Sequence, residues 1–393
     1  MPDNTEYAFS VDLSDSPESD PLFPVRKDGK WGYINQLGNV VIAPKFLQAG
    51  RFIDGMARVA LFPSGSAISE VTSPDPKATF FNRFNRFDKS LGSKRNIKYL
   101  FIDKSGSVVL NPNFDFVDQF YNGLARISNG DEFTGKWGFI DKEGNVVIEP
   151  NFQKAMPFSE GLAEVKINFK SGFIDKTGNV VIEPKFIESY AFSDGLALVC
   201  LGIMFDRRFG YIDRTGKMVI KPVYSEALSF SEGLAPVTPW GFYEGVWGYI
   251  DKSGNLVIKP KYDRAYPFSE GLAFVNRYPN WKIPNIFLRS MTEPSKQALI
   301  NKKGEVITDF VFSRTGNFSD GLCRVSLDSR PKDFRDDAYK QGKTGYLDKS
   351  GSLKIPYQFN DAHDFYNGLA YVKIGDQWGY INKNGSFVYR PTK

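Results

Sequence analysis

The chain has 393 residues, of which 41% are hydrophobic and 24% are charged, and its formal net charge is +5. This composition is typical of a globular protein and excludes a disordered or fibrous one. Aromatic residues make up 15% of the chain and glycine is frequent, which favours short strands and tight turns over helices. A single histidine and two cysteines argue against a disulfide-bonded framework and against histidine-based catalysis or metal binding.

The first segment, residues 1–20, is an acidic leader. It holds six carboxylates and no basic residue, a net charge of −6. It lacks the basic start and apolar core of a signal peptide, and no stretch of the chain is apolar enough to span a membrane. We therefore expect a disordered leader on a soluble, cytoplasmic protein without a transmembrane segment.

Residues 21–393 repeat one unit that is anchored on an aromatic-Gly-aromatic-Ile sequence. A fixed period of this kind indicates a repeat array rather than separate domains. The four clearest anchors contain the pairs Trp31 and Gly32, Trp137 and Gly138, Trp247 and Gly248, and Trp378 and Gly379. Degenerate copies begin at Tyr99, Ser171, Phe209, Gln297 and Thr344.

Each unit contains three predicted strands in a meander. Strand a is Leu-Ala-x-Val, strand b is the anchor, and strand c is Val-Val-Ile. An Asp or Asn followed three residues later by Gly joins b to c, as Asp141 and Gly144 do, and this spacing is typical of a tight hairpin. A Phe-Ser-Glu-Gly segment, such as residues 158–161, precedes strand a and predicts another turn.

These motifs resemble the WG-repeat (KWG-type) family, which is named for the Trp-Gly pair. The resemblance extends over residues 21–393, and the copies that begin at Tyr99, Gln297 and Thr344 depart from the pattern. Membership implies a β-rich repeat protein, typically bacterial, with no shared catalytic residues.

We predict an all-β fold, a tandem array of about nine three-stranded β-meander modules in an open or superhelical stack. The alternative is a closed β-propeller, in which Phe-x-x-Ala-x-x-Phe would supply a fourth strand and residues 22–25 would neighbour residues 387–390. Apolar residues on both faces of strand b indicate that the Trp-Gly anchors pack between modules rather than bind a ligand.

All length variation falls between strands a and b. The long insertions are residues 61–98, 276–296 and 326–343, with net charges of +4, +3 and +1. Equivalent loops of a repeat array project from one edge, and such loops are common binding sites. The candidate binding residues lie in the first two insertions: Arg83, Phe84, Arg86, Phe87, Lys89, Lys94, Arg95, Tyr278 and Trp281.

The function that we expect is a non-catalytic scaffold that binds a macromolecule, most simply a protein, through a–b loops on one basic edge. The alternative is carbohydrate, cell-envelope or nucleic-acid binding through exposed aromatic and Arg or Lys residues. No convergent acid, base and nucleophile set indicates an enzyme, and no motif indicates a cofactor or metal. Cys200 and Cys323 fit small packing positions, and His363 fits a surface or half-buried one.

Overall fold

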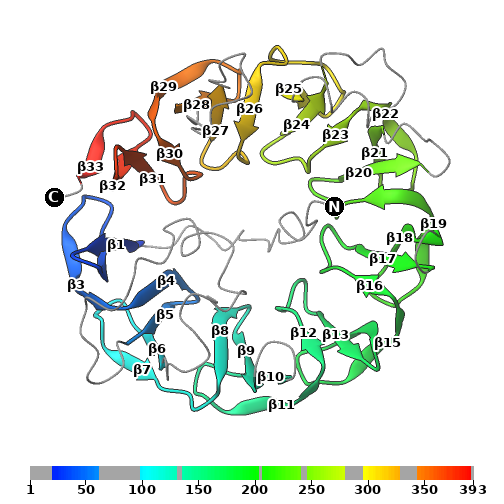
Figure 1. The fold of residues 1–393 in the computed structure, drawn as a ribbon. Helices are drawn as coiled ribbons and strands as arrows, with labels where there is room; N and C mark the ends of the chain where they lie inside the picture. Colours follow the sequence, from blue (N-terminus) through cyan, green and yellow to red (C-terminus); the bar gives the residue numbers. More distant parts are fainter. Residues whose placement is uncertain are drawn as a thin grey trace, which may run out of the picture. The chain divides into compact units, whose positions relative to one another are not determined.

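The computed structural model describes residues 20–61, 98–130, 135–202, 206–239, 246–278, 295–327 and 343–390. Every element in these ranges is a β-strand (Figure 1). The chain forms two compact units, Met1–Ala191 and Phe192–Lys393. The prediction of an all-β repeat protein is therefore confirmed. The choice between an open stack and a closed propeller stays a prediction.

The first unit contains β1 to β16. These strands are β1 (Phe23–Lys27), β2 (Lys30–Ile34), β3 (Val40–Phe46), β4 (Gln48–Ile53), β5 (Met56–Ala60), β6 (Tyr99–Ile102), β7 (Val108–Leu110), β8 (Phe116–Tyr121), β9 (Leu124–Asn129), β10 (Lys136–Ile140), β11 (Val146–Phe152), β12 (Lys154–Ala155), β13 (Ala163–Ile167), β14 (Lys170–Ile174), β15 (Val180–Phe186) and β16 (Glu188–Ser189).

The second unit contains β17 to β33. These strands are β17 (Ala197–Leu201), β18 (Arg208–Ile212), β19 (Met218–Ala227), β20 (Leu234–Pro239), β21 (Trp247–Asp251), β22 (Leu256–Tyr262), β23 (Arg264–Ala265), β24 (Leu272–Arg277), β25 (Lys296–Asn301), β26 (Phe312–Thr315), β27 (Leu322–Leu327), β28 (Thr344–Asp348), β29 (Leu353–Phe359), β30 (Asp361–Ala362), β31 (Leu369–Ile374), β32 (Gln377–Asn382) and β33 (Phe387–Tyr389).

The predicted meander of strands a, b and c is present in antiparallel sheets, and a fourth strand, d, precedes strand a in most of them. In the first unit the sheets are β1-β2-β3, β4 to β7, β8 to β11 and β12 to β15, here called modules 1 to 4. Strand d comes from the Phe-x-x-Ala segment that was expected to form a strand only in the propeller alternative. It was missed because it can be as short as the two residues of β12.

In the second unit the modules also follow one another in chain order, and some are joined into larger sheets. The ten-residue β19 is strand c of one module and strand d of the next, so β17 to β22 run without a break. Strands β23 to β29 likewise form one seven-stranded sheet, and β30 to β33 form the last.

The glycine of the Trp-Gly anchor lets strand c cross strand b at very short range. Strand c carries a bulge opposite this glycine, with Trp137 paired to Phe152 but Phe139 to Ile148. A Cβ added at Gly138 would lie 2.3 Å from the Ile148 carbonyl oxygen and 2.7 Å from the Pro150 nitrogen. A side chain at this position would therefore collide with the backbone of strand c, and Gly32 and Gly248 have the same surroundings.

Both predicted turns form. In the b–c hairpin, the Asp141 carboxylate accepts the backbone N–H groups of Glu143 and Asn145 at 3.1 and 2.7 Å. In the d–a turn, Glu160 and Gly161 both have positive φ, 50° and 87°, between the paired residues Ser159 and Leu162. The Asp-x-x-Gly and Ser-Glu-Gly motifs are therefore turn sequences.

The hydrophobic core lies between consecutive sheets of each unit. The strand-b aromatic of one module meets the Phe of the next Phe-Ser-Glu-Gly segment, as Phe139 meets Phe158 with ring centroids 4.8 Å apart. In modules with tyrosine at this position, the buried hydroxyl also donates to a backbone carbonyl, as Tyr249 does to Tyr266, directly after strand β23, at 2.8 Å. These contacts explain why both aromatic positions recur.

The anchor Trp residues were predicted to pack between modules, and three of the four are buried. Trp31, Trp137 and Trp247 are buried. Trp378 is half-buried and stacks on Tyr371, with centroids 4.7 Å apart and planes 12° apart, while Gly379 beside it is buried.

In three modules without Trp, the residue at the Trp position makes a polar or cation–aromatic contact instead. Thr344 bonds Ser326 at 2.8 Å, Gln297 accepts from Thr315, and the Arg58 guanidinium lies 4.9 Å from the Tyr99 ring centroid. The residues that replace Trp in these copies therefore each have a polar or cationic partner in the same sheet.

Candidate functional site

Because the strands of a module run antiparallel in the order d-a-b-c, the connections between them lie at two opposite ends of the strands. The d–a and b–c turns lie at one end of the strands, here called the turn edge. The a–b connections and the c-to-d links lie at the other end, here called the a–b edge. All a–b loops of one unit therefore share an edge, as expected from the sequence.

At the turn edge, polar groups of neighbouring modules bond to one another. The Asp54 carboxylate accepts the Gly123 N–H at 2.8 Å, and the Lys142 ammonium donates to the Asp54 carbonyl at 2.8 Å. In the second unit, Asp320 and Gly368 repeat the first contact at 2.7 Å. These carboxylates have structural partners, which fits turn formation better than acid or base catalysis.

The a–b edge of the first unit is basic, whereas its turn edge is acidic. The exposed or half-buried lysines at the a–b edge are Lys27, Lys30, Lys45, Lys98, Lys136, Lys154, Lys166, Lys170 and Lys185, against the carboxylates Asp28, Asp115 and Glu188. The turn edge holds Asp54, Asp103, Asp141, Glu143, Glu160 and Asp175 against Lys104, Lys142 and Lys176. Charges of one sign thus gather where the a–b loops emerge, and they create a positive field there.

The a–b connection of module 4 is a two-residue hairpin with an exposed aromatic at its tip. Asn168 and Phe169 both have positive φ, 48° and 60°, and lie between the paired residues Ile167 and Lys170. The Phe169 side chain is 79% exposed. Its N–H donates to Gln153 Oε1 at 2.8 Å, which fixes the turn on the link between β11 and β12.

Buried charged side chains lie between the modules of the first unit, at position x of Leu-Ala-x-Val. Arg126 forms an ion pair with Asp118 in which both side chains are buried. Its guanidinium also donates to the Ala155 carbonyl at 2.7 Å and lies 5.2 Å from the Trp137 ring centroid. Sequence reasoning missed this set, although charged residues within an apolar strand motif were a usable signal.

Glu164 occupies position x in module 4 and has a different environment. Burial raises the pKa of its carboxyl, and this effect exceeds the opposing ones of Lys154 and the Ser171 hydroxyl. Ser171 donates to the carboxylate at 2.9 Å. This serine stands where other modules have Trp, so the smaller residue leaves room for a polar pair.

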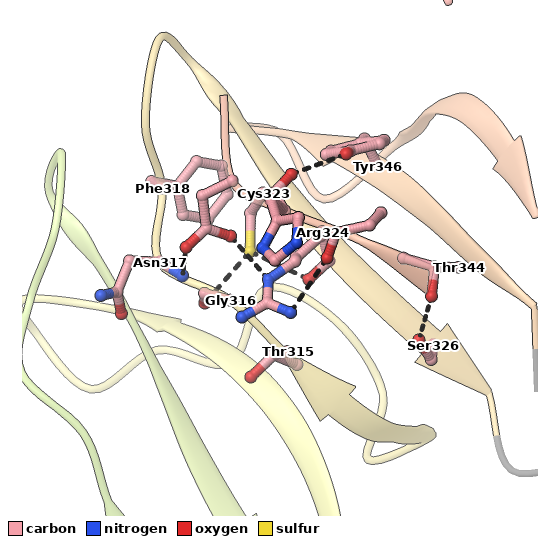
Figure 2. Close-up of polar contacts among 12 residues, drawn as sticks. Thr315, Gly316, Asn317, Phe318, Cys323, Arg324, Ser326, Thr344 and Tyr346 are labelled. Carbon is pink, nitrogen blue, oxygen red and sulfur yellow. Dashed lines mark hydrogen bonds and ion pairs between the residues drawn. The ribbon is translucent and has the colours of Figure 1, made fainter. Parts of the chain in front are cut away.

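In the second unit, the corresponding charged residue is Arg324, shown in Figure 2. Its Nε donates to Asp364 at 2.8 Å and its Nη1 to the Ala362 carbonyl at 3.1 Å. A Cβ at Gly316 would lie 2.0 Å from the Asp364 carboxylate, so a side chain there would displace the ion pair. The carboxylate raises the pKa of the guanidinium, and the cluster joins β26, β27 and the last module.

Figure 2 also shows Cys323, whose thiol donates to the Gly316 carbonyl at 3.3 Å. Burial raises the pKa of this thiol well above its usual value, which disfavours the nucleophilic thiolate. Cys200 is buried too, so both cysteines occupy the packing positions that were predicted. His363 is half-buried, as expected.

Most of the predicted binding residues lie outside the described residues. These are Arg83, Phe84, Arg86, Phe87, Lys89, Lys94, Arg95 and Trp281. Tyr278 is described and half-buried, and its N–H donates to the Asp263 carboxylate at 2.8 Å, so it is less exposed than expected for an outward aromatic.

The strands extend further into two of the predicted loops than expected. β24 includes Asn276 and Arg277, which pair with Gln297 and Lys296 of β25. β27 continues to Leu327. The described strands on either side of insertion 61–98 end at Ala60 and begin at Tyr99, as the sequence predicted.

Within the described ranges, no group of three or more His, Cys, Asp and Glu residues could hold a metal ion. None of the elements described is a helix long and apolar enough to cross a membrane.

A comparison with family models gives one match, described as the WG containing repeat. It covers eight segments: residues 31–61, 101–133, 137–170, 172–202, 209–238, 247–277, 299–330 and 345–378. Each matched segment begins at or near strand b and extends to the following strand a or beyond. No curated protein matches the sequence.

The comparison with solved structures matches a propeller domain and a peptidase, among others. The β-propeller domain of the Trilobed protease from Pyrococcus furiosus is 11% identical, with 72% of this chain and 100% of that chain covered and a TM-score of 0.37. Dipeptidyl peptidase 4 from Porphyromonas gingivalis is 9% identical, with 95% and 59% covered and a TM-score of 0.45. Similarities this weak carry no argument about the present chain.

Proposed function

This chain belongs to the WG-containing repeat family, and from that premise we propose that it is a non-catalytic, cytoplasmic scaffold that binds an acidic protein partner through a–b loops. The partner would contact the a–b edge of the first unit, where insertion 61–98 emerges. The repeat modules supply the rigid frame, and the loops and lysines supply recognition.

The observation that carries this proposal is the separation of charge between the two edges of the first unit. Lysines from several modules, such as Lys45, Lys136 and Lys185, lie at the a–b edge. The carboxylates at the turn edge are engaged in turns and contacts between modules, as Asp54 is. An edge with a net positive charge steers an acidic partner towards it and repels basic ones.

The absence of catalysis is part of the proposal and has its own support. The repeated Ser-Glu-Gly carboxylates bond to backbone groups of the next turn, and the Cys323 thiol has a raised pKa. Buried Arg126 and half-buried Arg324 are each engaged in an ion pair, with Asp118 and Asp364. Each of these groups thus has a structural role that accounts for it.

The test is capture of partners from a nuclease-treated lysate of the source organism. Three proteins are compared: the full chain, a variant with residues 61–98 replaced by a short Gly-Ser loop, and a control with residues 326–343 replaced in the same way. Circular dichroism checks that all three keep the same fold. Captured proteins are identified and quantified by mass spectrometry, and binding is repeated at rising salt.

We expect one or a few acidic proteins to be captured by the full chain and by the control but lost with the 61–98 replacement. Their binding should weaken as salt rises, because exposed charges are screened. Capture that is equal for all three proteins would overturn the assignment to this edge. If the full chain captures no protein, the proposed protein partner is overturned.

A further inference from the structure

The hairpin tip of module 4 is the most unusual exposed feature of the first unit. A two-residue hairpin turn needs positive φ at both central residues, for which Asn-Gly and Asp-Gly are the preferred sequences. Module 1 follows this rule with Asp28 and Gly29, whose φ values are 49° and 76°. Module 4 has Asn168 and Phe169 in the same turn.

A phenylalanine in this conformation is strained, and its side chain is not buried in return. Bulky residues at positive φ are outliers, and such strain persists where it has a function or where packing imposes it. Packing does not impose it here, because Phe169 is the most exposed large hydrophobic side chain in the described part of the chain, at 79%. The side chain therefore costs stability and leaves its apolar surface in water.

The tip is also preorganised and surrounded by positive charge. The hydrogen bond from the Phe169 N–H to Gln153 holds the backbone in one conformation. Lys170 follows directly, and Lys166 pairs with Lys154 on the adjoining strand. An aromatic side chain on a fixed backbone with a polar rim is the usual composition of an interface hot spot.

We propose that Phe169 is the anchor with which the first unit binds its protein partner, inserted into an apolar pocket that carries acidic residues at its rim. Lys154, Lys166 and Lys170 face those acidic residues. This proposal rests on the proposed function, since it names the contact by which the same edge holds the same acidic partner. It predicts opposite effects of one substitution on stability and on binding.

The decisive variant is Phe169→Gly, which recreates the module 1 turn. We expect its melting temperature to rise, because glycine relieves the strain and removes an exposed apolar group. Its affinity for the partner captured by the full chain should fall about tenfold or more, the usual loss at a hot spot. Phe169→Tyr should keep most of the affinity.

Leu37→Ser is the matched control. Leu37 is 78% exposed in the b–c turn of module 1, at the opposite edge. Its replacement should leave partner binding unchanged. If Leu37→Ser weakens binding as much as Phe169→Gly does, apolar surface in general drives the association and the anchor proposal is overturned.

The outcomes separate this proposal from the proposed function. If the full chain captures no protein, the proposed function fails. If it captures a partner that Phe169→Gly binds equally well, only the anchor is overturned. A lower melting temperature for Phe169→Gly would make the side chain structural and would overturn the anchor without any partner in hand. Phe169-dependent sedimentation with phosphatidylserine vesicles, in the absence of a protein partner, would assign the tip to membranes and overturn it too.

Discussion

At the residue scale, the repeat is fixed by positions where only one side chain fits. The role of the glycine in the Trp-Gly pair could be predicted from the sequence, because a glycine within a strand indicates a close backbone approach. The polar residues that replace Trp could not, because their partners lie on other strands. Ser171 bonds Glu164, and Thr344 bonds Ser326, in pairs that only the register reveals.

Replacement of Gly138 by alanine should destabilise the protein strongly. The new Cβ would lie 2.3 Å from the Ile148 carbonyl oxygen, and neither atom can move away unless the backbone shifts. We expect a loss of about 3 kcal/mol in the free energy of unfolding, at the upper end of overpacking effects. Urea unfolding followed by tryptophan fluorescence measures it.

Gly50→Ala is the control for this substitution. A Cβ at Gly50 would lie 3.1 Å from the Gln119 side chain and 3.2 Å from the Arg58 carbonyl, so small shifts can accommodate it. The loss in the free energy of unfolding should be clearly smaller for Gly50→Ala than for Gly138→Ala. Equal losses for the two variants would mean that the crossing of strands b and c does not determine the cost.

At the scale of strands, the sequence predicted a, b and c but not the full role of d or of position x. Strands a to c have several residues and a period of two, which makes them visible. Strand d can be as short as Lys154–Ala155 and has no period to detect. Position x looked variable, but in the first unit it is a buried position between sheets. Its arginine Arg126 donates to a carbonyl of the next module, that of Ala155.

Glu164→Gln should make the protein more stable at neutral pH. Burial raises the pKa of the Glu164 carboxyl in the folded state, so the folded protein holds this proton more tightly than the unfolded chain. Stability therefore falls as pH rises from the unfolded pKa through the folded one. Glutamine resembles the protonated acid and can still accept the Ser171 hydrogen bond.

The measurement is the denaturation midpoint of both proteins between acidic and neutral pH. The two curves should coincide below the unfolded pKa and separate above it, with the glutamine variant more stable. A variant that is less stable at neutral pH would show that attraction from Lys154 and Lys166 outweighs the cost of burial. The pKa of Glu164 would then be lowered, not raised.

At the scale of the whole molecule, the array has two levels of order. The repeat order was readable from self-comparison, which gave the modules and their turns. The charge separation of the first unit was only partly readable, since the sequence showed basic insertions but not which framework lysines share their edge. That depends on strand direction, which places Lys45, Lys136 and Lys185 together.

A repeat array also couples mainly neighbouring modules, so damage at one interface should stay local. The Arg126–Asp118 pair tests this, because both residues lie in module 3 and the Arg126 guanidinium donates to the Ala155 carbonyl of module 4. Asp118→Asn leaves the buried guanidinium without its charge partner, which typically costs about 3 to 5 kcal/mol. We expect faster hydrogen exchange in β9, β10 and β13, whereas β1 to β3 of module 1 should keep their protection.

The double variant Asp118→Leu with Arg126→Met is the matched comparison, because it removes both charges and keeps an apolar contact. It should recover much of the protection in β9 to β13, since replacing a buried ion pair by apolar residues is often neutral. If Asp118→Asn instead raises exchange uniformly over β1 to β15, the first unit unfolds as one cooperative block. The nearest-neighbour description would then fail, and the rigid frame that the scaffold proposal assumes would be a property of the whole unit.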